Sequence, residues 1–224
     1  MRAWISGAAT RANLAAAVIL PCMREAPPCA ARAQRGGDAG PVLSSPRSPH
    51  FLACVMTGPP IAIVPARPDE LSAVQRLAGI IWRAHYPGII TTEQIDYMLE
   101  RGYALDALGS FLARRDRGLE LAKVDFELAG FAAWYVTDDP GEAKLDKLYV
   151  LQDYQRHGLG GRLIERVAAL ARDAGAAMLI LNVNKNNVQA IRAYEKRGFA
   201  IREAVVVDIG NGFVMDDYVM AKAI

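Results

Sequence analysis

The sequence predicts an α/β fold in which a mixed central sheet of about seven strands is flanked by about four helices. Short apolar segments that fit strands alternate with segments whose apolar residues recur at helical spacing, and glycine or proline separates them. The segment MLILNVN, residues 178–184, is almost entirely apolar, as is typical of a buried strand. With 224 residues, 52% of them hydrophobic, the chain is long enough for one well-buried domain.

The first predicted elements are a strand and a helix. Residues 61–67, IAIVPAR, form a short apolar strand closed by Pro65 and Pro68. A helix follows over residues 69–86, with Asp69 as its cap, and Pro87-Gly88 breaks it. Its apolar positions are Leu71, Val74, Leu77, Ile80 and Ile81.

A second helix is predicted over residues 91–102. Thr91 or Thr92 provides its N-cap, and Gly102 ends it. Three strands come next, at residues 119–124, 128–136 and 143–151, and the first two form a hairpin around residues 125–127.

The next helix is the clearest one in the sequence. Gly175 ends it, and charged residues occupy the side opposite its apolar stripe of Leu159, Leu163, Ile164, Val167, Leu170, Ala171 and Ala174. The strand at 178–184 leads to another helix, capped by Asn186 or Asn187 and predicted to run to Arg197 before Gly198 stops it. Two closing strands are predicted at residues 200–209 and 213–224.

The first 56 residues differ in composition from the rest. They contain all three cysteines, no lysine, and six arginines against two acidic residues. We interpret residues 1–56 as a disordered or mis-assigned N-terminal extension, with Met56 as the true start, and residues 57–224 as the folded domain. A targeting peptide is the alternative, but the apolar run 14–20 is far shorter than the ~18 residues of a membrane span, so no membrane partner is expected.

The charge balance of the remaining chain excludes some functions. Without the extension, 20 basic and 22 acidic residues remain, which argues against a nucleic-acid groove lined with clustered Lys and Arg. The domain has no cysteine, so we expect no disulfide, no thiolate nucleophile and no zinc–thiolate site. A reducing cytoplasm is the expected location.

A glycine-rich loop joins the strand at 143–151 to the helix after it. In YQRHGLGGRLIERV, residues 154–167, Gly158, Gly160 and Gly161 keep side chains away from the first helical N–H groups, so these donors can reach an anion such as diphosphate. A P-loop is excluded because Arg162-Leu163 stands where Lys and Ser or Thr are required, and Leu163 also replaces the third glycine of a dinucleotide fingerprint. The alternative is that the glycines only permit a tight turn and close helix packing.

Two motifs carry a resemblance to a known family. Residues 155–160, QRHGLG, resemble the Q/R-x-x-G-x-G/A signature of the GNAT superfamily of N-acetyltransferases. The later segment NKNNVQAIRAYEKRGF resembles its second signature, with Asn187, Ala190, Tyr194, Gly198 and Phe199 at the defining positions. The resemblance covers about residues 60–224 and implies the GNAT fold, with acetyl-CoA as co-substrate and no metal.

The resemblance also implies roles for individual residues. The strand before the loop offers backbone groups to the pantetheine arm of acetyl-CoA, and the loop holds its pyrophosphate. Asn187 and Tyr194 lie near the thioester, where the Tyr194 hydroxyl donates a proton to the departing thiolate. The implied cofactor-binding residues are Leu148, Tyr149, Val150, Gln155, Arg156, His157, Gly158, Leu159, Gly160, Gly161 and Asn187.

Two of these residues have plainer alternatives. Tyr194 shares a helix face with Ala190 and Ile191, so it is also consistent with a structural tyrosine packed among apolar residues. His157 belongs to the phosphate loop, where phosphate contact or simple exposure is favoured over proton transfer.

The general base is not evident from the sequence. Some family members that acetylate protein N-termini carry a glutamate where this chain has Asn182, and an amide cannot take up a proton. Asn182, with Asn184 on the same strand face, is instead predicted to orient a water or the substrate amine. The candidate base is that water acting towards a carboxylate such as Asp146 or Glu93, although a solvated surface position is expected for both acids.

Acceptor choice is expected to lie between the first two helices. Trp82, His85 and Tyr86 are available there for stacking or hydrogen bonding, with a purely structural role for Trp82 and Tyr86 as the alternative. The resemblance thus implies an acetyl-CoA-dependent N-acetyltransferase that acts on a primary amine, either a small amine or polyamine or a peptide, as a monomer or homodimer. A catalytically inactive acyl-CoA-binding regulatory module is the alternative, and a nucleotide-binding domain is a more distant one.

Overall fold

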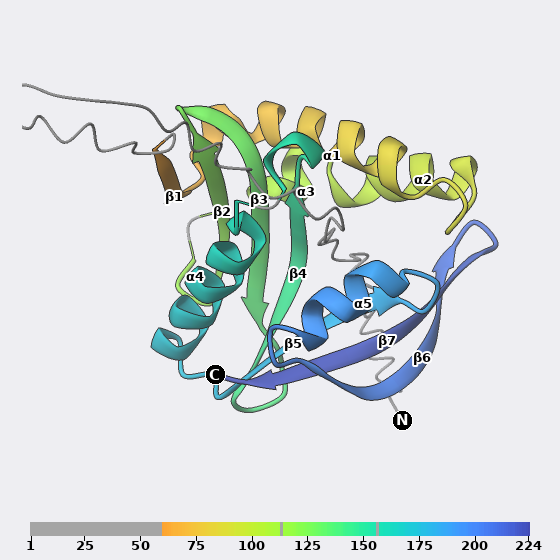
Figure 1. Cartoon of the computed structure of the whole chain (residues 1–224). Coiled ribbons are helices and arrows are strands. Elements are labelled where there is room, and N and C mark those ends of the chain that lie inside the picture. The colour runs from red at the N-terminus through yellow and green to blue at the C-terminus, as the bar shows by residue number, and fades with distance from the viewer. Residues whose placement is uncertain (1–59, 113, 156) are drawn as a thin grey trace, which may run out of the picture.

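The computed structural model describes residues 60–112, 114–155 and 157–224. The predicted N-terminal extension, residues 1–56, and Arg156 of the glycine-rich loop lie outside the described residues. The described chain forms a seven-stranded mixed sheet with helices on both faces, which confirms the predicted α/β fold (Figure 1).

Each strand and helix predicted from the sequence is present. The strands are β1 (Ile61–Pro65), β2 (Arg117–Val124), β3 (Glu127–Val136), β4 (Glu142–Val150), β5 (Met178–Asn184), β6 (Ala200–Gly210) and β7 (Phe213–Ala223). The helices are α1 (Leu71–His85), α2 (Thr92–Gly102), α3 (Leu105–Gly109), α4 (Leu159–Asp173) and α5 (Val188–Glu195), with the 3-10 turns η1 (Pro68–Glu70) and η2 (Gln152–Tyr154). Only α3 was not predicted, because five residues are too few to display a helical period.

The sheet has the strand order β1-β2-β3-β4-β5-β7-β6, and its neighbouring strands are antiparallel except for β4 and β5. These two pair in parallel over three residue pairs only, from Glu142↔Met178 to Lys144↔Ile180. Beyond Lys144, β4 continues along β3 while β5 continues along β7, so the sheet opens between them. A bulge follows at once, because Trp134 pairs with Leu145 and Ala133 with Lys147, which leaves Asp146 as the extra residue of β4.

Two hydrophobic cores lie on opposite faces of the sheet. One packs α4 and α5 against the strands, with Leu163, Val167 and Tyr194 among its fully buried members. The other packs α1 and α2 against the opposite face, around Trp82 and Tyr149. Figure 1 shows α4 along the β1–β4 half of the sheet, α5 beside β5 and β7, and α1 and α2 as a separate layer.

The structure shows which of the two candidate N-cap residues caps each of the helices α2 and α5. Thr91 caps α2, since its hydroxyl accepts a hydrogen bond from the Gln94 N–H at 3.2 Å. Asn187 caps α5, with its side-chain oxygen 3.3 Å from the Ala190 N–H. Both N-cap bonds satisfy a donor that the helix itself leaves without an acceptor.

Two predictions for the first helix were wrong. Asp69 is not a helix cap, because residues 68–70 form the 3-10 turn η1 and α1 begins only at Leu71. Ile80 does not belong to the buried stripe and is 60% exposed. The stripe instead runs through Val74, Leu77, Ala78 and Ile81 to Trp82, at the spacing of three and four residues that keeps side chains on one helix face.

This difference predicts unequal effects on stability from two substitutions in α1. Leu77→Ala should lower the free energy of unfolding by about 2–5 kcal/mol, because Leu77 is buried and its loss leaves a cavity. Ile80→Ala should change it by no more than about 0.5 kcal/mol, because the side chain is already in water. Urea denaturation of both variants measures the free energy of unfolding. Equal losses for the two variants would mean that Ile80 is buried in the core as well.

Candidate active site

The separation of β4 from β5 leaves one edge of β4 without a strand partner. Apart from Asp146 in the bulge, residues 145–150 pair with β3 on one side, and they have no partner from β5 on the other. Leu148, Tyr149 and Val150, predicted to bind the pantetheine arm, lie in this stretch. The side chain of Gln155 donates to the Val150 carbonyl at 3.1 Å, so two predicted cofactor residues meet at the end of β4.

The glycine-rich loop forms the entry to α4. Gly158 is the N-cap residue with a left-handed φ of 74°, a conformation that favours glycine, and its carbonyl accepts the first helical bond from Arg162 at 3.0 Å. Leu159, Gly160 and Gly161 occupy the first turn and are buried. Their N–H groups have no acceptor within the helix, so the loop has the donors that a phosphate group needs.

One cation beside this loop was not predicted from the sequence. The guanidinium of Arg197 lies against Gly161, so closely that a Cβ at that position would come within 2.2 Å of it. Glu165 pairs with Arg197 at 3.8 Å, and the arginine is half-exposed. Arg197 follows α5, outside the signature positions, and only the three-dimensional fold brings it to the loop. His157, by contrast, is exposed and lies 3.4 Å from the Tyr154 carbonyl through Nδ1.

Unpartnered polar atoms gather at the opening. Among the described residues, six buried side-chain atoms lack a hydrogen-bond partner, namely His85 Nε2, Trp134 Nε1, Asp146 Oδ1, Asn187 Nδ2, Tyr194 Oη and Asp217 Oδ1. Trp134 belongs to the core on the α4 face, beside Gly118. The other five come from α1, β4, β5–α5 and β7 around the opening. Buried polar groups are normally paired, so this cluster indicates a place where bound molecules supply the partners.

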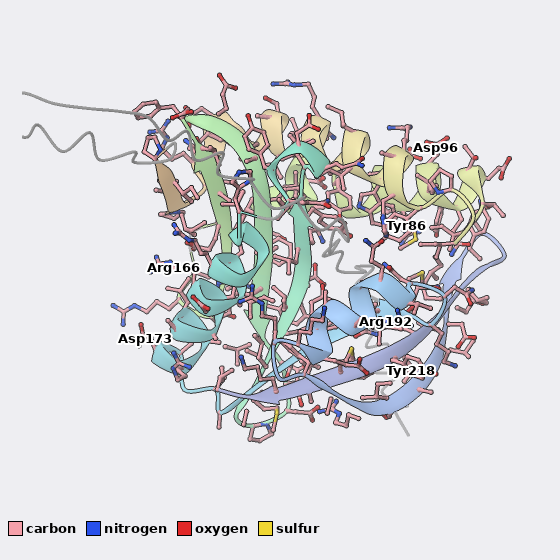
Figure 2. The ribbon with its side chains drawn as sticks, viewed as in Figure 1. Tyr86, Asp96, Arg166, Asp173, Arg192 and Tyr218 are labelled. Carbon is pink, nitrogen blue, oxygen red and sulfur yellow. The ribbon has the colours of Figure 1, made fainter. Side chains whose placement is uncertain are left out.

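The pKa shifts of these groups reflect burial and interactions with one another, which indicates that the groups lie close together. Burial raises the pKa of Tyr194 well above its usual range, so the hydroxyl is protonated at neutral pH. Burial also raises the pKa of Tyr86, and the charges of Tyr149, Tyr194 and Asp217 raise it further. Figure 2 shows Tyr86 between the α1–α2 layer and α5. Burial lowers the pKa of His85, against the smaller opposing effect of Asn187, so the imidazole is neutral at pH 7.

A cavity of about 1020 Å³ lies on the α2–α3 side of the sheet, where it also touches the β6–β7 hairpin. Lys144, Asp146, Asn182 and Asp217 line it from β4, β5 and β7. Trp82 and Tyr86 are both buried, with ring centroids 4.4 Å apart. This packing agrees with the alternative that the two residues have a structural role. The opening therefore has the glycine-rich loop on one side of the sheet and this cavity on the other.

The two candidate carboxylates from the sequence have different positions. Glu93 is exposed, as expected. The expected surface position of Asp146 was wrong, because the residue is 2% exposed and its Oδ2 lies 2.6 Å from the ammonium of the equally buried Lys147. The bulge in β4 places both Asp146 and its neighbour Lys147 on the cavity side, an arrangement that the regular alternation of a strand does not reveal.

Neither a membrane-spanning helix nor a metal-binding cluster occurs in the described part of the chain. None of its helices is long and apolar enough to cross a membrane. No group of three or more His, Cys, Asp or Glu side chains there could hold a metal ion. The glycine-rich loop and the unpartnered hydroxyl of Tyr194 fit an acyl-CoA, which presents a pyrophosphate and a thioester.

Comparisons with known proteins agree with this geometry. Residues 75–199 match the model of the acetyltransferase (GNAT) family. An uncharacterized N-acetyltransferase of Mycobacterium bovis is 30% identical over 154 residues, which is 69% of this chain and 96% of that protein. A spermidine N(1)-acetyltransferase of Thermoplasma acidophilum is 23% identical over 66% of this chain and 91% of its own length.

A solved structure extends the comparison to the fold. The PaiA N-acetyltransferase of Thermoplasma acidophilum, in complex with coenzyme A, superimposes with a TM-score of 0.63 at 22% identity, covering 74% of this chain and 99% of that one. The chain thus shares the fold of that N-acetyltransferase. The chain belongs to the acetyltransferase (GNAT) family and is an N-acetyltransferase.

The position of Arg197 predicts a charge-specific effect on cofactor affinity. Arg197→Gln should weaken acetyl-CoA binding about tenfold, because a charge-assisted hydrogen bond to phosphate contributes about 1.5–3 kcal/mol. Arg172→Gln removes the same charge from the far end of α4 and should leave the affinity unchanged. Titration calorimetry at low and high salt measures both, and the Arg197 effect should shrink with salt. Equal acetyl-CoA affinities for the two variants would show that Arg197 does not bind the phosphate groups.

Proposed function

We propose that the protein transfers the acetyl group of acetyl-CoA directly to a primary amine, with Tyr194 as general acid. The observation that carries this proposal is the Tyr194 hydroxyl, which is buried, protonated and without a partner among the described residues. Tyr194 comes from α5, on the face of the sheet that carries the glycine-rich loop. It also interacts electrostatically with Tyr86 and Tyr149, which belong to the core on the opposite face. A proton donor in that position suits a leaving group at the opening.

The donor side of the site supports acetyl-CoA as the co-substrate. The N–H groups of residues 158–161, together with Arg197, are the proposed pyrophosphate site, and the free edge of β4 at Leu148–Val150 is the proposed pantetheine site. Asn187, whose Nδ2 has no partner in the described chain, adds a donor near Tyr194. His157 is exposed beside the loop and contributes at most a peripheral phosphate contact.

The cavity supports an amine that enters as a cation. Six carboxylate side chains and four cationic ones line it, so its field favours a positively charged guest. The relative named as a spermidine acetyltransferase is consistent with this class of acceptor. Asn182, on the cavity wall, is proposed to position the amine or a water next to it.

Direct transfer requires two proton movements. An alkylammonium, with a pKa of about 10.4, has no lone pair and must lose a proton before it attacks the thioester. The departing thiol has a pKa of about 8.5, so its sulfur needs a proton as the carbon–sulfur bond breaks. Tyr194 supplies that proton and regains one from the nitrogen of the new amide. No covalent enzyme intermediate is needed.

The inactive acyl-CoA-binding module remains a second candidate, because Asn182 cannot act as a base. We expect wild-type protein to release free thiol from acetyl-CoA when it is given a panel of alkylamines, polyamines and peptides. The assay follows thiol release together with the mass of each acetylated amine. Cofactor binding with no turnover for any amine would favour the regulatory module instead.

Removing only the hydroxyl of Tyr194 tests its proposed role. Tyr194→Phe keeps the ring packed against Phe199, 5.6 Å away between centroids, so stability and acetyl-CoA affinity should change little. The value of kcat should fall by about 10²- to 10⁴-fold with KM little changed, as expected for loss of a general acid.

Tyr218→Phe is the matched control, because it removes a phenol hydroxyl from β7 that neither lines the cavity nor belongs to the unpartnered buried atoms of the described chain. It should retain kcat. If Tyr194→Phe turns over at the wild-type rate, Tyr194 has only a structural role.

A further inference from the structure

Asp217 lies on the cavity face of β7. It pairs with Asn184 of β5 in an antiparallel register, and the neighbouring Val219 pairs with Asn182. Residues directly opposite each other in such a pair project from the same face of the sheet. Asp217 therefore shares the face of Asn182 and Asn184, beyond the point at which β4 and β5 separate.

The carboxyl group of Asp217 is buried yet reaches the cavity. The residue is 3% exposed, and it lines the cavity together with Lys144 and Asn182. Its Oδ1 has no hydrogen-bond partner in the described part of the chain. A buried, unpaired carboxylate oxygen is costly, so a group that enters the cavity and donates a proton or hydrogen bond is its natural partner.

The groups around Asp217 leave it able to take up a proton near neutral pH. Burial raises its pKa to about 6, although Lys144 of β4, Asn182 of β5 and Lys185 favour the charged form. Asp216 raises the pKa, but it is half-exposed and pairs with Lys185. Tyr86, which directly follows α1, interacts electrostatically with the carboxylate, and burial raises its pKa so that it is a protonated phenol.

The other carboxylates considered for this task are less suited. Asp146 lines the same cavity, but Lys147 holds its Oδ2, and protonation would leave a buried ammonium without a counter-charge. Glu93 is exposed near the start of α2 and does not line the cavity. Among these three, only Asp217 combines burial, access to the cavity and freedom from a cationic partner within salt-bridge distance.

We propose that Asp217 is the general base that accepts a proton from the ammonium form of the acceptor in this cavity. This inference rests on the proposed acetyl transfer to an amine. In the step, one N–H bond of the ammonium breaks and its proton passes to Asp217, which frees the lone pair that forms the new C–N bond. The thiol leaves with the proton that Tyr194 supplies, and Asp217 releases its proton to solvent after the product departs. Asn182 is a positioning residue that lies beside the carboxylate.

The experiment compares Asp217→Asn with wild type and with Asp216→Asn, each as the full chain, with an alkylamine that the panel identifies. Wild-type kcat/KM should rise through pH 6 and then stay level, because Asp217 must be ionised while the ammonium is the species bound. Asp217→Asn should lose about 10²- to 10⁴-fold at pH 7. Its remaining activity should climb with pH up to about 10, following the free amine. Asp216→Asn should keep the wild-type profile with its rise at slightly lower pH, because Asp216 raises the pKa of Asp217.

A second readout separates the chemical role from a structural one. An acceptor whose amine has a pKa of about 8, such as a peptide α-amino group, is about half free base at pH 8, whereas an alkylamine is almost entirely protonated, so Asp217→Asn should lose much less activity with the peptide. The midpoint of thermal unfolding at pH 7.5 should be higher for Asp217→Asn than for wild type. Because burial raises the pKa of Asp217 to about 6, the carboxylate is ionised at pH 7.5 at a cost to the free energy of unfolding. The asparagine side chain carries no charge and avoids this cost.

The possible failures are distinct. If wild type acetylates no amine, the proposed function fails and takes this inference with it. If wild type acetylates amines and Asp217→Asn keeps the same profile and rate, the proposed function stands and Asp217 is not the base. An equal loss with both classes of amine also contradicts the inference, because it indicates a role in positioning alone.

Discussion

The site depends on the separation of β4 from β5 after three residue pairs. The two strands can diverge because each keeps a full partner on its other edge, β3 for β4 and β7 for β5. The cost of the opening is thus confined to backbone groups on the two facing edges. Those groups face the gap between two layers of helices, where a ligand that carries amides can pair with them. We interpret the open edge as the place where the pantetheine arm completes the sheet.

The cluster of unpartnered polar atoms follows from that separation. Each buried polar group without a partner costs about 1–3 kcal/mol, and five such atoms surround one opening. A fold selected for stability alone would replace or pair them. We therefore interpret His85, Asn187, Tyr194 and Asp217 as groups retained for what they do when substrates are bound, and the two hydrophobic cores as the source of stability that tolerates them.

Local signals in the sequence were sufficient for much of this arrangement. The turn at Gly158, the cap at Asn187 and the apolar stripe of α4 depend on residues within one or two helical turns, and each is present in the structure. The family motifs were also enough to identify the fold and the acetyltransferase class. Ile80 was misplaced because the helical period was applied too loosely, and α3 is too short for any period.

Contacts between distant segments could not be predicted in this way. Asp146 is buried in an ion pair with Lys147, and the bulge in β4 that brings these two neighbours to one side of the strand depends on pairing with β3. Asp217 reaches the cavity only through the register of β7 on β5, more than thirty residues away along the chain. The one local sign was a charged residue at an alternate position between the buried Met215 and Val219. Arg197 likewise meets Gly161 only through the fold, because the two residues are far apart in the sequence.

A crystal structure of the protein with coenzyme A bound would show whether the gap between β4 and β5 is the cofactor site. We expect the pyrophosphate at the N–H groups of residues 158–161 and the pantetheine arm along β4 between the separated strands. The sulfur should lie within about 4 Å of the Tyr194 hydroxyl, on the side from which the Asp217 cavity is reached. If coenzyme A bound elsewhere, the gap between β4 and β5 would not be the cofactor site. If its sulfur were directed away from both Tyr194 and the cavity, Tyr194 could not be the general acid.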